Sequence, residues 1–152
     1  MAGSLVAFSA GGTVAWRLDL LTYYCWHCYG TNRKASGPCQ ECGQEIGAPA
    51  GTSFDDRLLW ALGHPLAERR MAAVLALGKR RLARASGSLS ELVRDPDPYL
   101  AAVALEALVE IDGAEKHGPL LAELRRSAPP TVRAVARRVS SAESTAVRRN
   151  GG

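Results

Sequence analysis

The sequence predicts a mainly α-helical protein, a solenoid of about three helical hairpins that follows a small N-terminal module with β structure. Apolar residues recur with a helical period from residue 54 onward, and this pattern repeats at offsets of 31 and then 32 residues. Aromatic residues make up only 6% of the 152 residues, so we expect a core of Ala, Leu and Val, which suits closely packed helices. The only four cysteines lie before the helical part.

Residues 1–24 carry the weakest pattern. Residues 5–8 and 13–18 flank the glycine-containing stretch 9–12, which predicts two short strands around a turn. A helix over residues 13–22 is the alternative. The chain starts without a basic segment and without about 18 consecutive apolar residues, so we expect neither a signal peptide nor a membrane span.

The four cysteines form two close pairs with ten residues between them: Cys25 and Cys28, then Cys39 and Cys42. Two residues between thiolates allow both to reach one ion, so two such pairs are typical of a tetrahedral zinc site. Sulfur would fill every position around the ion, which predicts a structural site without a catalytic water. We expect a cytoplasmic, reducing location, where paired cysteines bind metal rather than form disulfides.

Iron bound by the same thiolates and a redox dithiol at Cys25 and Cys28 are the alternatives to zinc. A dithiol of that type lies at a helix N-terminus beside a βαβ sheet, which is not predicted here. Gly43 directly follows the second pair and can adopt the positive φ that closes a cysteine turn, whereas Gly30 follows the first pair one residue later. Residues 23–47 resemble a zinc ribbon or zinc-knuckle module, which implies one structural Zn²⁺.

A linker with Pro49 and Gly51 follows this module, and we place the domain boundary near residue 51. Ser53 and Asp56 then have the spacing of a helix N-cap, in which side-chain oxygens accept from the first free amides. The predicted division is residues 1–50 for the module with its preceding hairpin, 52–142 for the helical part and 143–152 for a flexible tail.

The helical part consists of three similar units. Three segments align, and their shared alanines are expected in the core: residues 69–77, 100–108 and 132–140, with Ala73, Ala104 and Ala136. Prolines divide each unit, and proline can end one helix and occupy the first turn of the next. Each unit is therefore helix, turn, helix, over about residues 54–80, 86–111 and 117–141. Units of this size bury their apolar faces by stacking.

The middle unit, from Asp95-Pro96 to Ala107-Leu108, resembles a HEAT repeat of the short bacterial form. The resemblance covers about residues 54–141. The outer units depart from it, since the first lacks an Asp before Pro65 and the third has Val139-Ser140 in place of Ala-Leu, as expected of capping repeats. The resemblance implies an α-solenoid, a scaffold that serves many binding tasks.

Aromatic residues and arginines are the candidates for a partner-binding surface: Trp26, Tyr29, Arg70, Arg133 and Arg137. Trp26 and Tyr29 flank the first cysteine pair, where they either pack on the repeats or face a partner. The arginines belong to the second helices of their units. For them the HEAT resemblance implies an alternative, an ion pair with a turn aspartate of a neighbouring unit, Asp95 or Asp97.

The C-terminal third is the basic part of a chain with net charge +4, since residues 125–149 contain seven arginines and one acid, Glu143. A segment of this kind attracts phosphate backbones or acidic protein surfaces. A nucleic-acid- or ribosome-associated factor, using the zinc module and this Arg-rich third, is therefore the alternative function.

The sequence contains no recognisable catalytic set. His64 and His117 lie beside turns without a serine or cysteine partner, and there is no Gly-rich phosphate loop. We therefore predict a non-enzymatic adaptor that binds another protein through its repeats and zinc module, with no membrane and no small-molecule substrate. Bilin lyases also contain short bacterial HEAT-like repeats, but here the cysteines are expected to be committed to metal.

Overall fold

The structure is a computed structural model that describes residues 22–150, with side chains described as far as Ser141. The chain divides into two compact units, Met1–Gly47 and Ala48–Gly152, and each is described by itself. The strands expected over residues 5–8 and 13–18, and the alternative helix, lie outside the described residues.

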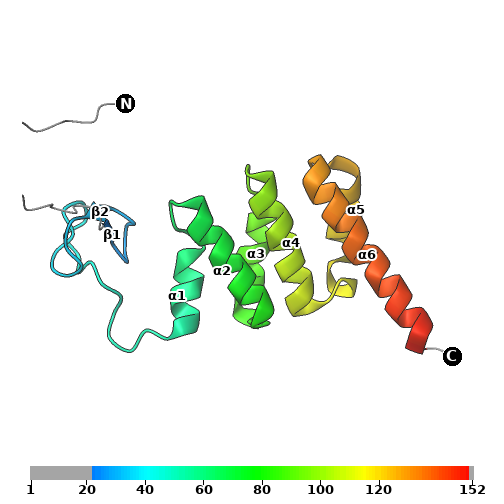
Figure 1. Cartoon of the computed structure of the whole chain (residues 1–152), viewed down its shortest axis with the longest axis horizontal. Helices are drawn as coiled ribbons and strands as arrows, with labels where there is room; N and C mark the ends of the chain where they lie inside the picture. Colours follow the sequence, from blue (N-terminus) through cyan, green and yellow to red (C-terminus); the bar gives the residue numbers. More distant parts are fainter. Residues whose placement is uncertain (1–21, 151–152) are drawn as a thin grey trace, which may run out of the picture. The chain divides into compact units, whose positions relative to one another are not determined.

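The described part of the first unit, residues 22–47, contains one short antiparallel sheet. Strand β1 (Tyr23–Tyr24) pairs with β2 (Thr31–Asn32), so that Tyr23 lies opposite Asn32 (Figure 1). Its buried apolar residues are Cys25, Cys39 and Ile46, and Tyr23 packs against them. Within residues 22–47 the core is therefore two thiols and one isoleucine, which is far smaller than a folded segment needs for independent stability.

The second unit is built from antiparallel helix pairs that follow one another along the solenoid (Figure 1). The helices are α1 (Phe54–Ala61), α2 (Ala67–Lys79), α3 (Ser86–Leu92), α4 (Pro98–Asp112), α5 (Gly118–Ser127) and α6 (Pro130–Asn150). Two 3₁₀ turns, η1 (Ala83–Ala85) and η2 (Glu115–His117), precede α3 and α5. Within each pair the first helix packs on the second, and the second helices pack on one another, α2 on α4 and α4 on α6. The predicted fold class, a mainly α solenoid with a small β module, is confirmed.

Helix α4 is the centre of the apolar core, because it contacts both α2 and α6 as well as its own partner α3. Its buried residues are Leu100, Ala101, Ala102, Ala104, Leu105, Ala107 and Leu108. The three alanines that align between the units, Ala73, Ala104 and Ala136, are buried as predicted. Helix α1, at one end of the stack, has no buried residue.

Helices α2 and α4 approach closely where Gly78 faces Ala107. A methyl group at position 78 would lie 2.9 Å from the Ala107 Cβ and 3.0 Å from its Cα. Contacts under 3.0 Å do not occur between real Cβ atoms, so glycine is required by the packing here and not by backbone conformation.

The helix starts differ in how they are capped. Ser53 and Asp56 form a capping box at α1, as predicted, and the Ser53 hydroxyl lowers the pKa of the Asp56 carboxyl. The Asp97 carboxylate caps α4 by accepting from the amides of Tyr99 and Leu100. Leu66, at the start of α2, makes no side-chain cap.

The turn before α2 is instead held by His64, which is fully buried. The Leu66 amide donates to His64 Nδ1 at 3.1 Å, so this nitrogen is unprotonated in the hydrogen bond. The Arg70 guanidinium donates to the His64 carbonyl oxygen at 2.9 Å. Burial, followed by the charges of Arg69 and Arg70, lowers the pKa of the imidazole.

Helix α6 differs from the sequence expectation. We expected a tail from residue 143, but the helix continues to Asn150. The repeat length set the expected end, whereas the segment from Thr131 to Asn150 contains no glycine or proline to stop a helix before Gly151.

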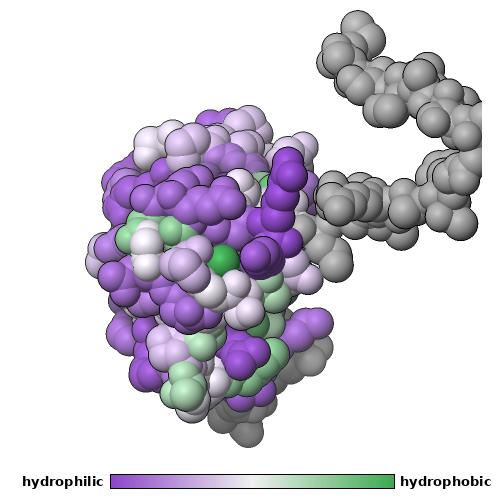
Figure 2. Space-filling model, turned by 90° about the vertical axis from the view of Figure 1, so that its left-hand side faces the viewer, coloured by the Kyte–Doolittle hydropathy of each residue, from purple (hydrophilic) through white to green (hydrophobic). Residues whose placement is uncertain are grey.

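The large hydrophobic side chains exposed among the described residues are Phe54, Leu66, Leu75 and Tyr99. The Arg80 guanidinium lies over the Phe54 ring, 5.4 Å from its centroid. The face of the molecule in Figure 2 is mostly hydrophilic, with hydrophobic residues only in small patches. Within residues 22–150, no helix combines the length and the apolar character that crossing a bilayer requires.

Candidate metal centre

The four predicted ligands come together in the first unit. The sulfur atoms of Cys25, Cys28, Cys39 and Cys42 all lie within 4.8 Å of one another. Two of the separations, Cys25 Sγ to Cys42 Sγ and Cys28 Sγ to Cys39 Sγ, are each 3.7 Å. Sulfurs at about 2.3 Å from a tetrahedral zinc ion would be about 3.8 Å apart. All four cysteines are free thiols, and their arrangement is compatible with a zinc site.

The two cysteine turns have the same backbone hydrogen bonds. In the first turn, the Tyr29 amide donates to the Cys25 carbonyl oxygen at 3.0 Å, and the Cys25 amide donates to that of Gly30 at 2.9 Å. In the second turn, residues 39–44 form the equivalent pair at 2.9 and 2.7 Å. Each turn therefore presents its two sulfurs from a hydrogen-bonded backbone.

Both turns are closed by a residue with positive φ, and in the first turn that residue is not a glycine. Gly43 has φ 74° and Tyr29, at the equivalent position, has φ 59°. Gly30, which the sequence offered as the flexible residue, does not have a positive φ but lies close to the exposed Glu41 side chain and to Cys28 Sγ. A Cβ there would lie 2.6 Å from the Glu41 side chain and 3.1 Å from Cys28 Sγ.

Backbone amides point at the sulfurs. The amides of His27, Gly30 and Glu41 donate to the sulfurs of Cys25, Cys28 and Cys39, each at 3.4 Å. Such donors stabilise thiolates before any ion is bound.

Asn32 connects the two turns and is a site residue that sequence reasoning missed. Its side chain is buried and donates to the Gly30 carbonyl oxygen at 2.9 Å and to Cys39 Sγ at 3.5 Å. Its own carbonyl oxygen accepts from the Gln40 amide at 3.2 Å. The sequence shows only that a polar residue follows the first cysteine turn, and this feature is too common to identify a site residue.

The thiols differ in acidity. Amides of Cys42 and Glu41, with further hydrogen bonds, lower the pKa of the Cys39 thiol to about 6. The Gly30 amide also lowers the pKa of Cys28, but desolvation and the three neighbouring sulfurs outweigh it and raise that pKa to about 12. Hydrogen bonds thus stabilise one thiolate in this cluster, but all four thiols can lose their protons only when a cation lies between them. Zn²⁺ and iron are thiophilic cations, so this donor set fits either of them.

The aromatic candidates lie beside the cluster and are partly buried. The Trp26 amide donates to the Ile46 carbonyl oxygen at 2.9 Å, which ties the first cysteine turn to the end of the module. Burial raises the pKa of the Tyr29 hydroxyl.

The arginine candidates differ from one another. Arg70 is partly buried and donates to backbone carbonyl oxygens of the turn before α2, where it braces the turn. On α6, Arg133 is partly buried and Arg137 is exposed.

The ion pairs between units use residues other than those expected. Arg138 of α6 pairs with Glu106 of α4, and Arg94 pairs with Glu123 of α5 at 3.4 Å. Asp97 caps α4, and Asp95 accepts from the Asp97 amide at 2.9 Å.

Asp112, at the end of α4, interacts with two residues of the following 3₁₀ turn. Its carboxylate lies 3.0 Å from His117 Nε2 and 3.0 Å from Lys116 Nζ. Desolvation raises the pKa of Asp112, but the hydrogen bonds from His117 and Lys116 outweigh it and lower the pKa. His117 therefore stabilises the turn after α4 through Asp112, which agrees with the structural role expected for it.

The comparisons with known proteins agree with this architecture. A family model described as HEAT repeats matches residues 56–141, which include α2 to α5 and most of α1. No curated protein and no solved structure matches the chain. Because the family match covers more than half of the 152 residues, the chain belongs to the HEAT repeat family.

Proposed function

We propose that this protein is a non-enzymatic zinc-binding adaptor that binds another protein through its HEAT repeats and its cysteine module. The convergence of four thiols, two pairs of them 3.7 Å apart, carries the proposal. With four sulfur ligands the ion has no open position, so its role is to hold the module together and not to activate water. Stacked repeats supply an extended surface, which is how solenoids bind proteins.

Zinc content is the first test of this proposal. Protein purified under reducing conditions should contain about one zinc per chain. Replacing Cys39 and Cys42 by serine should release the ion and unfold residues 23–47, while the far-UV helical signal persists. A Lys34→Ser variant, in the exposed loop between the pairs, is the matched control and should keep its zinc. Protein that contains neither zinc nor iron would overturn the assignment.

A reducing compartment, such as the cytoplasm, suits this chain because all four cysteines are free thiols. The partner test is affinity capture from the native lysate in nuclease-treated extract. We expect a protein to be retained at both low and high salt, since an apolar interface responds little to ionic strength.

A second candidate function is binding to nucleic acid or to the ribosome. One observation favours it beyond the Arg-rich C-terminal third. The end of α2 and the turn after it are basic, with Lys79, Arg80, Arg81 and Arg84 all exposed. Two of them pair with acids of α1, Arg80 with Asp55 and Arg84 with Asp56.

Salt dependence separates the two functions. A protein that neutralises several phosphates loses affinity steeply with salt, roughly 10³-fold or more between 50 and 200 mM for six contacts. Capture that disappears with nuclease or in high salt would favour the second function and contradict the adaptor.

A further inference from the structure

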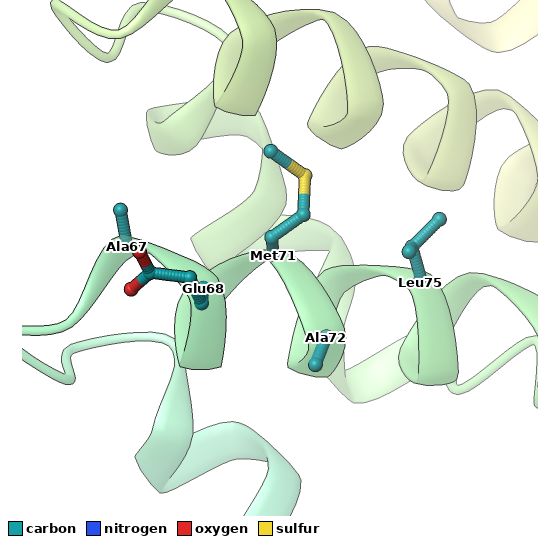
Figure 3. Close-up of a pocket in the computed structure, with 5 residues that line it drawn as sticks. All are labelled: Ala67, Glu68, Met71, Ala72 and Leu75. Atoms are coloured by element: carbon teal, nitrogen blue, oxygen red, sulfur yellow. The ribbon is translucent and has the colours of Figure 1, made fainter.

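The exposed side of α2 carries charged residues, with an apolar patch of Ala72 and Leu75 between Glu68 and Lys79. A groove of about 370 Å³ is lined by residues of this helix: Ala67, Glu68, Met71, Ala72 and Leu75. Figure 3 shows Met71 and Leu75 rising from the helix on the same side, while Ala72 points to the other side of this view. The buried residues of α2, Ala73, Val74, Leu77 and Gly78, occupy the opposite face of the helix.

The other two units have charged residues at the position that Leu75 occupies in the first unit. The repeat alignment places Leu75 at the position of Glu106 in the middle unit and of Arg138 in the last. Those two charged residues pair with each other across α4 and α6. Leu75 is instead 45% exposed. An outer unit of a solenoid normally presents polar residues to solvent, so an exposed leucine within an apolar groove marks an interaction surface.

Charges flank this groove at both ends of α2. Glu68, Ala72, Leu75 and Lys79 follow one another at spacings of four, three and four residues, which places them in one stripe along the helix. Glu68 and Lys79 are both exposed. Along the helix, the stripe therefore presents an acidic residue, a small residue, a large apolar residue and a basic residue, in that order.

We propose that this stripe is a homodimer interface, in which the α2 helices of two copies pack antiparallel about a two-fold axis. In that register Glu68 faces the partner's Lys79, and Ala72 faces the partner's Leu75. Each of these contacts occurs twice because the interface is isologous. The small alanine leaves room for the partner's leucine, and the flexible Met71 side chain fills the space beside them.

A second copy fits this surface better than an unrelated helix. The occupant must present base, large, small, acid against the stripe, and α2 itself has that order when it runs antiparallel. One helix face per copy buries less than the roughly 800 Å² per partner of a standard interface, so the dimer is weak, with a Kd of micromolar or above. This dimer goes beyond the proposed adaptor function and would place two adaptors in one assembly.

Sedimentation equilibrium of the full chain, reduced and zinc-loaded, tests the proposal at concentrations from about 1 µM to about 1 mM. We expect the average mass to rise from monomer toward dimer. Leu75→Glu introduces the residue of the middle unit and should weaken the dimer at least tenfold, while the melting curve stays unchanged because the position is exposed. A wild-type chain that remains monomeric throughout would overturn the proposal, and so would a dimer that Leu75→Glu leaves intact.

Charge swaps test the antiparallel register. Glu68→Lys alone and Lys79→Glu alone should each weaken self-association, since both create two like-charge contacts per dimer. An equimolar mixture of the two variants should restore a dimer, because each substituted residue then faces an opposite charge. Glu91→Lys, an exposed acid on α3, is the control and should have no effect. If the mixture stays monomeric, the register is wrong and the inference fails.

Discussion

The two units of this chain are stabilised by different means. Among its described residues, the cysteine module has three buried apolar residues, two of them thiols, and amides of its turns donate to sulfur. The repeats bury a continuous core of Ala, Leu and Val residues between Leu62 and Ala136, and partly buried residues of α1 pack against it. The difference leads us to expect that the module depends on a bound ion and that the repeats do not, so each should unfold under conditions that the other survives.

Metal removal should have the largest effect and should be confined to the module. Structural zinc contributes roughly 10–16 kcal/mol to the folding of small zinc modules. A strong chelator under reducing conditions should therefore unfold residues 23–47, seen as loss of dispersed NMR amide signals and as new protease cleavage there. The far-UV signal at 222 nm should change little. Simultaneous loss of the helices would show that the two units are not independent in stability.

The converse experiment places a charge in the core of the repeats. Ala104 is fully buried at the centre of α4, so Ala104→Glu should destabilise the repeats by several kcal/mol. Bound zinc should remain at wild-type level. Ala134→Glu, an exposed alanine of α6, is the matched control and should leave the urea midpoint nearly unchanged.

A pair of glycines sharpens the comparison within the repeats. Gly78→Ala forces a methyl group against Ala107 and should cost about 1–3 kcal/mol. Gly87 in α3 has no atom near its missing Cβ, so Gly87→Ala should instead stabilise by up to about 1 kcal/mol. Opposite shifts of the thermal midpoint are the expected result. Shifts of the same sign would contradict the close packing of α2 on α4.

The smallest effect is a pH dependence of the repeats that comes from His64. Its pKa is lowered in the folded state, so the unfolded chain binds the additional proton more readily. The stability it contributes is present above about pH 6.5, the ordinary value, and is lost as the pH falls below it. His64→Asn keeps an acceptor for the Leu66 amide and should flatten the decline in urea midpoint between pH 7.5 and 5.5. An equal decline in both proteins would assign the effect to other groups.

The sequence predicted the parts of the fold that depend on local pattern. The period of the alanines was enough to place Ala73, Ala104 and Ala136 in the core, because stacked repeats use the same position for the same contact. Cysteine spacing was enough to bring four sulfurs together, because two residues between thiols leave few ways to arrange a turn. The capping box at Ser53 was readable for the same local reason.

The features that the sequence did not reveal depend on how the chain turns back on itself, which residue types and their spacing do not show. Asn32 reaches the second cysteine turn only because β2 is folded beside it. Arg70 looked like a free or ion-paired surface residue, but its guanidinium turns back to the chain before its own helix. Tyr29 adopts a positive φ, which costs roughly 1 kcal/mol or more for a residue other than glycine, and nothing in the sequence around it indicates this conformation.

Each cysteine turn contributes one buried and one exposed sulfur, since Cys25 and Cys39 are enclosed while Cys28 and Cys42 reach solvent. An ion held between them would be shielded on one side and approachable on the other. Competing thiols, oxidants and metal-transfer proteins would therefore meet Cys28 and Cys42 first. Because these two belong to different turns, reagents in solvent can reach one sulfur ligand of each half of the module.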